Sequence, residues 1–208
     1  MNNDLDLFRS IADDLFKAEK VEPVLKPMEP SVLFSNLDIS LSQDGVDEET
    51  FARVLRDLVL STPRTASRKF FNQLFGGRNS KSTLGELLAV LLNNSMYTYK
   101  VGGPMIGVEK ELIHRSNQLL GYPAEADGTL APGGSMTNLM AMLMARDKAQ
   151  ESARTEGMSG KLCMYTSAES HYSIPKNAAF IGIGRNQIRY IESDAKGRMN
   201  PENLKVQI

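Results

Sequence analysis

A glycine-rich segment, Pro132-Gly133-Gly134-Ser135, precedes a stretch with helical spacing and could bind an anion. Glycines let the backbone turn tightly and let its N–H groups approach a ligand closely. The first turn of the following helix adds unpaired N–H groups and the positive end of the helix dipole. Ser135 and Thr137 add hydroxyl donors. The segment predicts a phosphate site at Gly134 and Ser135; the alternative is an ordinary turn with Ser135 as the helix N-cap.

His171 is the second candidate and one of only two histidines in the chain. It follows a predicted strand, and open α/β sheets bind ligands at the carboxyl ends of their strands. A flat imidazole there could stack on an aromatic cofactor ring or transfer a proton. The alternative is a loop histidine hydrogen-bonded to the backbone. We expect His114 and Lys176 to be solvated side chains on helices.

The third candidate is the amide pair Asn72-Gln73, in the loop formed by residues 70–77. Amide side chains bind carboxylates without adding charge, so this pair could hold a carboxylate. The alternative is a turn that satisfies its own backbone groups. The sequence shows no obvious carboxylate pair and no Ser-His-Asp triad, so hydrolase chemistry has little support.

The first part of the chain has the periodicity of helices. Asp47 is expected to cap one helix, which Pro63 ends. Residues 20–45 carry three prolines and are expected to form an extended connector, and residues 96–104 are expected to be irregular. Apolar residues at helical spacing predict the other helices over 4–17, 83–94 and 105–120, the last ending at Gly121.

After Gly128, short apolar runs alternate with helical patterns, which indicates an α/β sheet. A polar surface loop is expected over 151–160. Asn200-Pro201-Glu202 opens a helix that has only begun at Ile208, so we expect the chain to be the N-terminal piece of a longer polypeptide. The patterns predict helices over 136–150 and 173–181 and strands over 161–167 and 187–193.

The composition limits the classes of partner. The net charge of -1 gives no electrostatic reason to bind nucleic acid or an anionic membrane. A single cysteine, Cys163, excludes an internal disulfide framework and a cysteine-based zinc cluster. Acidic residues stand where a signal peptide would have its basic region. We expect a cytoplasmic location, no metal site, no nucleic-acid partner and no membrane partner.

Four segments of the chain resemble, in order and in spacing, the group II pyridoxal-phosphate-dependent amino acid decarboxylases. This family includes the glutamate, cysteine sulfinate, aromatic amino acid and L-2,4-diaminobutyrate decarboxylases. The resemblance implies an α/β fold of the fold-type I class and a homodimer. It also implies an N-terminal helical dimerisation segment over 1–80 and the first part of the large cofactor-binding domain over 81–208. The segments are FFNQLFGG, MYTYKVGGPMIGVEKELI, GTLAPGGSMTNLMAMLMARDK and YTSAESHYSIPKNAAFIGIG.

The resemblance implies a role for each candidate residue. Gly134 and Ser135 would hold the phosphate of pyridoxal 5'-phosphate, His171 would stack on its pyridine ring and handle protons, and Gln73 would contact the substrate. Met136 stands where some members carry an acidic residue, which loosens any inference about the substrate.

The implied activity is a lyase reaction of amino acid metabolism, the decarboxylation of an L-amino acid to an amine and carbon dioxide. Gln73 favours glutamate, aspartate or cysteine sulfinate, with 2,4-diaminobutyrate still open. The resemblance places the Schiff-base lysine and the aspartate at the pyridine nitrogen beyond residue 208, so we expect the 208-residue chain alone to be inactive. Two alternatives remain: another fold-type I enzyme such as an aminotransferase or lyase, and a non-catalytic dimerisation module.

Overall fold

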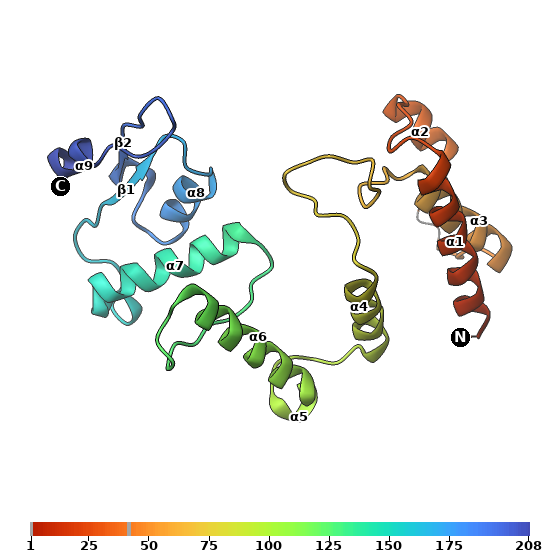
Figure 1. The fold of residues 1–208 in the computed structure, drawn as a ribbon, viewed down its shortest axis with the longest axis horizontal. Helices are drawn as coiled ribbons and strands as arrows, with labels where there is room; N and C mark the ends of the chain where they lie inside the picture. The colour runs from red at the N-terminus through yellow and green to blue at the C-terminus, as the bar shows by residue number, and fades with distance from the viewer. Residues whose placement is uncertain (1, 41–42) are drawn as a thin grey trace. The chain divides into compact units, whose positions relative to one another are not determined.

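A computed structural model describes residues 2–40 and 43–208, and within it the chain forms two compact units (Figure 1). The first unit ends at Asn94 and the second begins at Ser95. The first unit consists of helices joined by long connections. Its helices are α1 (Asn2–Val21), α2 (Pro30–Asn36), α3 (Glu48–Ser61) and α4 (Ser80–Leu92).

The helices of the first unit mostly follow the sequence predictions. Asp47 caps α3 as predicted, since its side chain accepts a hydrogen bond of 2.8 Å from the backbone N–H of Thr50. The prediction of an extended connector over 20–45 is partly wrong, because that range contains α2. Pro30 occupies the first turn of α2, where proline lacks only an N–H group that would have no helical partner. Residues 41–42 of the connector lie outside the described residues.

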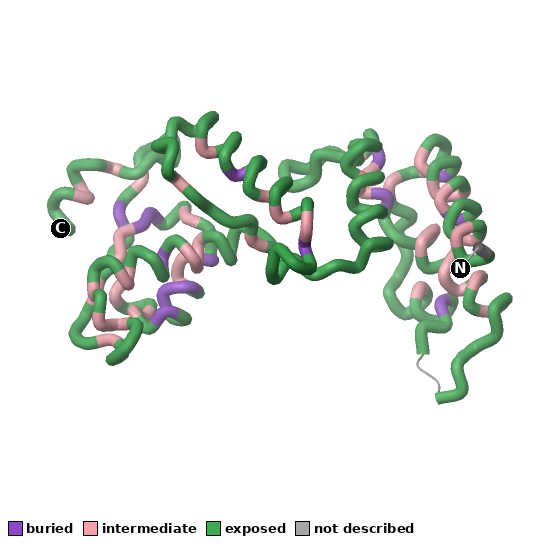
Figure 2. Tube along the Cα trace, turned by 90° about the horizontal axis from the view of Figure 1, so that it is seen from below, coloured by how far each residue is buried: buried purple, intermediate pink, exposed green. Residues whose placement is uncertain are grey.

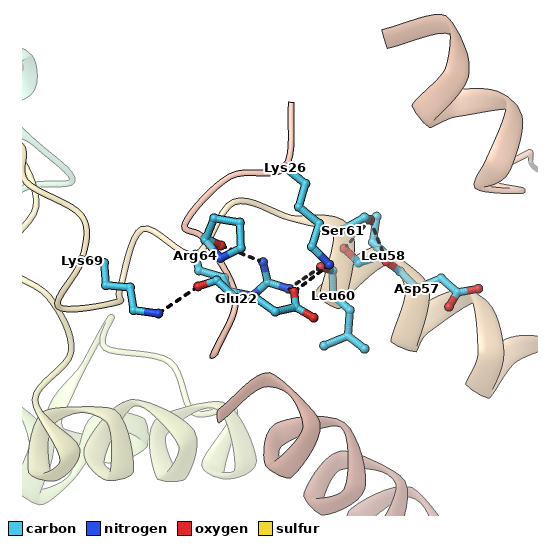
Figure 3. Close-up of polar contacts among 9 residues, drawn as sticks. Glu22, Lys26, Asp57, Leu58, Leu60, Ser61, Arg64 and Lys69 are labelled. Atoms are coloured by element: carbon cyan, nitrogen blue, oxygen red, sulfur yellow. Dashed lines mark hydrogen bonds and ion pairs between the residues drawn. The ribbon is translucent and has the colours of Figure 1, made fainter. Parts of the chain in front are cut away.

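A buried arginine joins the helix ends of the first unit (Figure 3). The side chain of Arg64 is 4% exposed, and its Nη2 donates to the Glu22 carboxylate at 2.5 Å and to the Leu60 carbonyl at 3.1 Å. Lys26 also pairs with Glu22, at 2.9 Å. A second ion pair, between Arg56 and Asp14, joins α3 to α1. Charged contacts therefore hold the end of α1 against the end of α3.

The second unit contains the βα arrangement that the sequence predicts. Strand β1 pairs with β2 in parallel, with Met164 opposite Ile188 and Ser167 opposite Ile191, and α8 connects the two strands. The elements are α5 (Tyr99–Gly102), α6 (Pro104–Leu120), α7 (Gly134–Ala149), η1 (Glu151–Arg154), β1 (Met164–Ser167), α8 (Ser173–Phe180), η2 (Arg185–Gln187), β2 (Ile188–Ile191) and α9 (Pro201–Gln207).

Some elements of the second unit differ from their predicted bounds. Strand β1 is shorter than predicted because its ladder with β2 starts only at Met164. Short helical segments, α5 and η1, occupy part of the ranges expected to be irregular or loop. Gly121 ends α6 in the left-handed conformation, with φ of 76°, and Asn200 caps α9, both as predicted.

The core of the second unit lies where α7 and α8 pack on the strands (Figure 2). Met142 of α7 is buried there, whereas Met136 and Met144 on the same helix are exposed. The methionine-rich helix therefore contributes to the core through one face. The buried residues of this cluster are Met142, Ala178, Ile181 and Ile188.

Among the residues that the structure describes, no helix combines the length and the apolar character of a membrane span. Over the same residues, no three His, Cys, Asp or Glu side chains gather as metal ligands would.

Candidate functional site

The N-terminus of α7 leaves backbone donors open. Gly133 is the N-cap, with φ of 134° and ψ of 163°, and the helix makes no side-chain capping bond. The N–H groups of Met136 and Thr137 both donate to the Gly133 carbonyl, at 3.0 and 3.2 Å. Within the described chain, the N–H groups of Gly134 and Ser135 have no hydrogen-bond partner. Two adjacent donors at the positive end of the helix therefore face outward.

The structure tests the N-cap interpretation of Ser135. Ser135 is the second residue of α7 and not its N-cap, so the plain-cap alternative is wrong. The prediction of a second hydroxyl donor at Thr137 is also wrong, because that hydroxyl donates to the Gly134 carbonyl at 2.9 Å. The geometry of the turn explains both results: Gly133, with its positive φ, takes the capping position and moves the helix start ahead of Ser135.

The space in front of these donors suits a phosphate. An added Cβ at Gly133 or at Gly134 would meet nothing within 4 Å, and Ser135 is exposed. No acidic residue lies in the first turn of α7, so nothing there repels an anion. Gly134 and Ser135 thus fit the phosphate of pyridoxal 5'-phosphate, which two N–H groups and the Ser135 hydroxyl could hold.

A cross-link from α8 fixes this turn. The Asn177 side chain is 4% exposed, and its Nδ2 donates to the Ser135 carbonyl at 2.9 Å. Because a buried amide left without its partner is costly, this bond holds the first turn of α7 against α8. The phosphate-binding candidate is therefore attached to the helix that follows β1.

His171 lies on the segment between β1 and α8, at the carboxyl end of β1 as predicted. Its Nδ1 lies 2.9 Å from the Ser173 hydroxyl and accepts the Ser173 backbone N–H at 3.2 Å. Ser173 Oγ in turn accepts a hydrogen bond of 2.9 Å from Asn138 Nδ2 on α7. These contacts link His171, through Ser173, to α7, the helix whose first turn contains Ser135. The alternative expectation, that His171 is a loop histidine hydrogen-bonded to the backbone, is therefore also confirmed.

The other polar candidates of this unit behave as expected. His114 is exposed on α6, with its Nε2 2.8 Å from Gln118 Nε2. Lys176 is exposed on α8, and its Nζ lies 5.1 Å from the centre of the Tyr172 ring. The rings of Tyr172 and His171 are also neighbours, with centroids 4.2 Å apart.

Gln73 belongs to the first unit, in the predicted loop between α3 and α4. The neighbouring Asn72 forms a turn with its own backbone, since its Oδ1 accepts the Leu74 N–H at 2.8 Å. Gln73 is exposed and makes no such bond within the described chain. Gln73 and His171 lie in different units, and the role of Gln73 as a substrate contact stays a prediction.

The polar cross-links between α7 and α8 are not predicted from the sequence. Ser173, Asn177 and Ile181 follow one another at four-residue spacing and are all buried. This spacing places two polar side chains on the inner stripe of a helix, which is a signal that polar partners lie opposite. Asn138 supplies one of these partners, and the Ser135 carbonyl supplies the other.

Comparisons with known proteins show the family to which the chain belongs. Residues 30–208 match the family described as "Pyridoxal-dependent decarboxylase conserved domain". Over 98% of its length the chain is 34% identical to mouse cysteine sulfinic acid decarboxylase and 33% identical to acidic amino acid decarboxylase GADL1 of Xenopus tropicalis. It spans only 42% and 40% of the length of these two relatives.

Solved structures show the same fold. The crystal structure of mouse CSAD matches 98% of this chain with a TM-score of 0.93 and 33% identity, and 44% of that chain is covered. A decarboxylase domain from Vibrio parahaemolyticus matches 97% of this chain with a TM-score of 0.85 at 21% identity, which shows the fold alone, and 46% of that chain is covered. The α/β fold expected from the resemblance is therefore confirmed for the part of the domain that this chain contains. The chain belongs to the pyridoxal-dependent decarboxylase family, whose cofactor is pyridoxal phosphate.

Proposed function

We propose that the protein carrying this chain uses pyridoxal 5'-phosphate to remove the carboxyl group of a small acidic L-amino acid as carbon dioxide. The observation that carries this proposal is that one unit contains both the open N–H groups of Gly134 and Ser135 and the imidazole of His171, which Ser173 holds. The relatives support the acidic substrate, since they are a cysteine sulfinic acid decarboxylase and an acidic amino acid decarboxylase.

The start of α7 would hold the phosphate group of the cofactor. The N–H groups of Gly134 and Ser135 would donate to its oxygens, and the helix dipole would favour its negative charge. Hydrogen bonds to a charged partner are stronger than those between neutral groups. The Asn177 bond to the Ser135 carbonyl keeps both donors in place before the ligand arrives.

His171 would lie against the cofactor ring and hold a proton on Nε2. Bound pyridoxal phosphate supplies an electron sink for the electron pair left behind when carbon dioxide departs. The role of this chain would be to keep the ring and the substrate in one orientation beside the imidazole. The contacts of Nδ1 with Ser173 leave Nε2 as the nitrogen available for that purpose.

Gln73 would bind the distal acidic group of the substrate. Its amide can donate to a carboxylate or a sulfinate without introducing a charge, and its exposed position leaves the amide accessible. In the whole protein we expect Gln73→Ala to raise KM for an acidic substrate more than it lowers kcat. An equal KM in the variant would remove Gln73 from the substrate site.

The direct test is a substrate panel for the whole protein with added cofactor. L-glutamate, L-aspartate, L-cysteine sulfinate and L-2,4-diaminobutyrate are supplied separately, and carbon dioxide and the amine are measured. Release of both from an acidic substrate supports the proposal. Release only from diaminobutyrate would overturn the acidic preference. A keto acid without carbon dioxide would indicate an aminotransferase, and no product from any substrate would indicate a non-catalytic module.

We also propose a homodimer in a reducing, cytoplasmic compartment. An apolar groove of about 520 Å³ lies between α1 and α3, and the large side chains Phe8 and Phe51 along it are 49% and 52% exposed. A second copy that covers this groove would remove apolar surface from water. Sedimentation of the whole protein, with Phe51→Asp as a variant, tests the dimer, because a wild-type monomer would contradict it.

The proposed compartment rests on Cys163. It is a free, exposed thiol, which suits a reducing compartment.

A further inference from the structure

Two side chains beyond those that would contact the cofactor hold the imidazole of His171. We propose that Asn138 and Ser173 are positioning residues which keep the His171 ring in one orientation, with its proton on Nε2. The structural part of this inference stands on hydrogen bonds alone. Its consequence for the reaction rests on the proposed function.

The direction of the bonds at His171 follows from the groups that make them. A backbone N–H can only donate, so Nδ1 must accept the Ser173 N–H at 3.2 Å. A neutral imidazole carries one proton, and with Nδ1 accepting, that proton is on Nε2. Within the described chain, Nε2 has no hydrogen-bond partner. The backbone thus selects the tautomer.

Asn138 directs the hydroxyl of Ser173. The Asn138 amide nitrogen is a donor, and it lies 2.9 Å from Ser173 Oγ. Since Ser173 Oγ accepts that bond, its own proton is free to point at His171 Nδ1, 2.9 Å away. The relay therefore runs in one direction, from Asn138 through Ser173 to His171.

Burial makes this relay a fixed part of the structure. Ser173 is 1% exposed, so water cannot replace either of its partners. Asn138 lies on α7, one turn after Gly134, and Ser173 is the first residue of α8. The imidazole is thereby tied to the same helix whose start would hold the phosphate. One rigid element would set the distance between phosphate and ring.

His114 provides a contrast within the same unit. The amide nitrogen of Gln118 contacts His114 Nε2 at 2.8 Å, so there the Nε2 atom accepts. His114 is exposed, and its contact involves residues of a single helix, α6. The accepting nitrogen at this contact is Nε2, whereas at His171 it is Nδ1, and His114 serves as an internal reference.

The test is the ¹⁵N spectrum of the histidine rings in the whole, cofactor-free protein. We expect His171 to show a protonated Nε2 and a hydrogen-bonded, unprotonated Nδ1. In Ser173→Ala, the Nδ1 resonance should move toward the position of a nitrogen with a free lone pair, because one donor is lost. Asn138→Asp, which is isosteric, should cause the same shift, since a carboxylate accepts the hydroxyl proton and turns it away from His171.

Asn177→Ala is the matched control. It also removes a buried amide bond between α7 and α8, but one that ends on the Ser135 carbonyl. Its His171 resonances should stay at the wild-type positions. The proposal is overturned if wild-type His171 is protonated on Nδ1, or if Nδ1 stays unshifted in both folded variants of the relay. Circular dichroism establishes that each variant is folded.

A kinetic arm separates this inference from the proposed function. If the protein decarboxylates an amino acid, Ser173→Ala should lower kcat about tenfold with little change in KM, because ring orientation and not substrate binding is lost. Unchanged kcat in a variant with shifted Nδ1 would refute the kinetic role. A shifted Nδ1 in a protein without decarboxylase activity would sink the proposed function and leave the relay intact.

Discussion

Helices α3 and α7 begin in opposite ways. The start of α3 is capped by the Asp47 side chain, and two further acids, Glu48 and Glu49, lie in its first turn. The start of α7 has a glycine as its cap, no capping side chain and no acidic residue in its first turn. The chain thus satisfies the positive end of one helix with its own carboxylates and leaves the other open. An open, positive helix end of this kind can bind an anion.

The two units also differ in the kind of contact that joins their helices. The first unit joins its helix ends through charged groups, with Arg64 bound to Glu22 and Arg56 to Asp14. The second unit joins the start of α7 to α8 through neutral amides and a hydroxyl, and Arg146 near the end of α7 donates to the Ile181 carbonyl at the end of α8. Neutral cross-links position the phosphate site without placing a competing charge beside it. Charged groups therefore join the helices of the first unit, whereas uncharged groups join the start of α7 to α8 in the second.

The largest expected effect is the loss of the imidazole. In the whole protein, His171→Ala should reduce decarboxylation about 100-fold or more, as expected when a group that transfers protons is removed. His114→Ala, which alters only an exposed contact on α6, should retain the wild-type rate. Steady-state rates of carbon dioxide release check both. Equal rates in the two variants would mean that the second unit does not carry the chemistry.

The next effect concerns the charged contacts of the first unit. Arg64→Ala removes hydrogen bonds to the Leu60 and Pro23 carbonyls and to Glu22, and it leaves a cavity. We expect a loss of about 3 kcal/mol in the free energy of unfolding, measured by urea titration. Arg9→Ala, in an exposed pair with Asp6, should change that free energy by less than about 0.5 kcal/mol. A similar small change for both would show that Arg64 is not structural.

A smaller effect is expected at the cap of α3. Asp47→Ala should lower Tm by about 3 °C, since a helix loses its N-cap, whereas Asp47→Asn should keep Tm near the wild-type value because asparagine also caps. Neither variant should change the affinity for pyridoxal phosphate. Differential scanning calorimetry and a cofactor titration check this. Weaker cofactor binding in either variant would contradict the separation of stability from ligand binding.

The smallest effect is a dependence of stability on pH. The backbone N–H of Thr50 holds the pKa of Asp47 below its ordinary value of 3.8. Because the pKa is lower in the folded state, ionised Asp47 stabilises the fold above about pH 4, and that stabilisation is lost as the pH falls through the lowered value. Asp47→Asn should flatten the fall in Tm between about pH 4 and pH 2. An identical fall in both proteins would rule out this contribution.

Features set by neighbours in the sequence could be predicted. The caps at Asp47 and Asn200 and the glycine stop at Gly121 each depend on a few adjacent residues, and all three are confirmed. The sequence predicts the start of α7 two residues late, because it does not reveal that Gly133 takes a positive φ. Local chemistry thus locates a helix end to within one turn.

Features set by packing could not be predicted. The bonds from Asn138 to Ser173 and from Asn177 to Ser135 join residues 35 and 42 positions apart. Four-residue spacing shows that Ser173 and Asn177 share a face, but the partner of each becomes known only when α7 packs on α8. The extent of β1 likewise depends on where β2 begins to pair with it. The sequence therefore supplies the candidate residues, and the fold shows which side chains hold them in place.

The central claim is that backbone donors at the start of α7 bind the phosphate of the cofactor. Gly134→Pro removes one donor at the first helical position, where proline is tolerated, and Gly134→Ala adds a Cβ but keeps that donor. Affinities for pyridoxal 5'-phosphate and for phosphate-free pyridoxal are measured in the whole protein. We predict that Gly134→Pro weakens binding of the phosphate form about tenfold or more relative to Gly134→Ala and leaves pyridoxal binding unchanged. Equal affinity of the two variants for pyridoxal 5'-phosphate would contradict the claim.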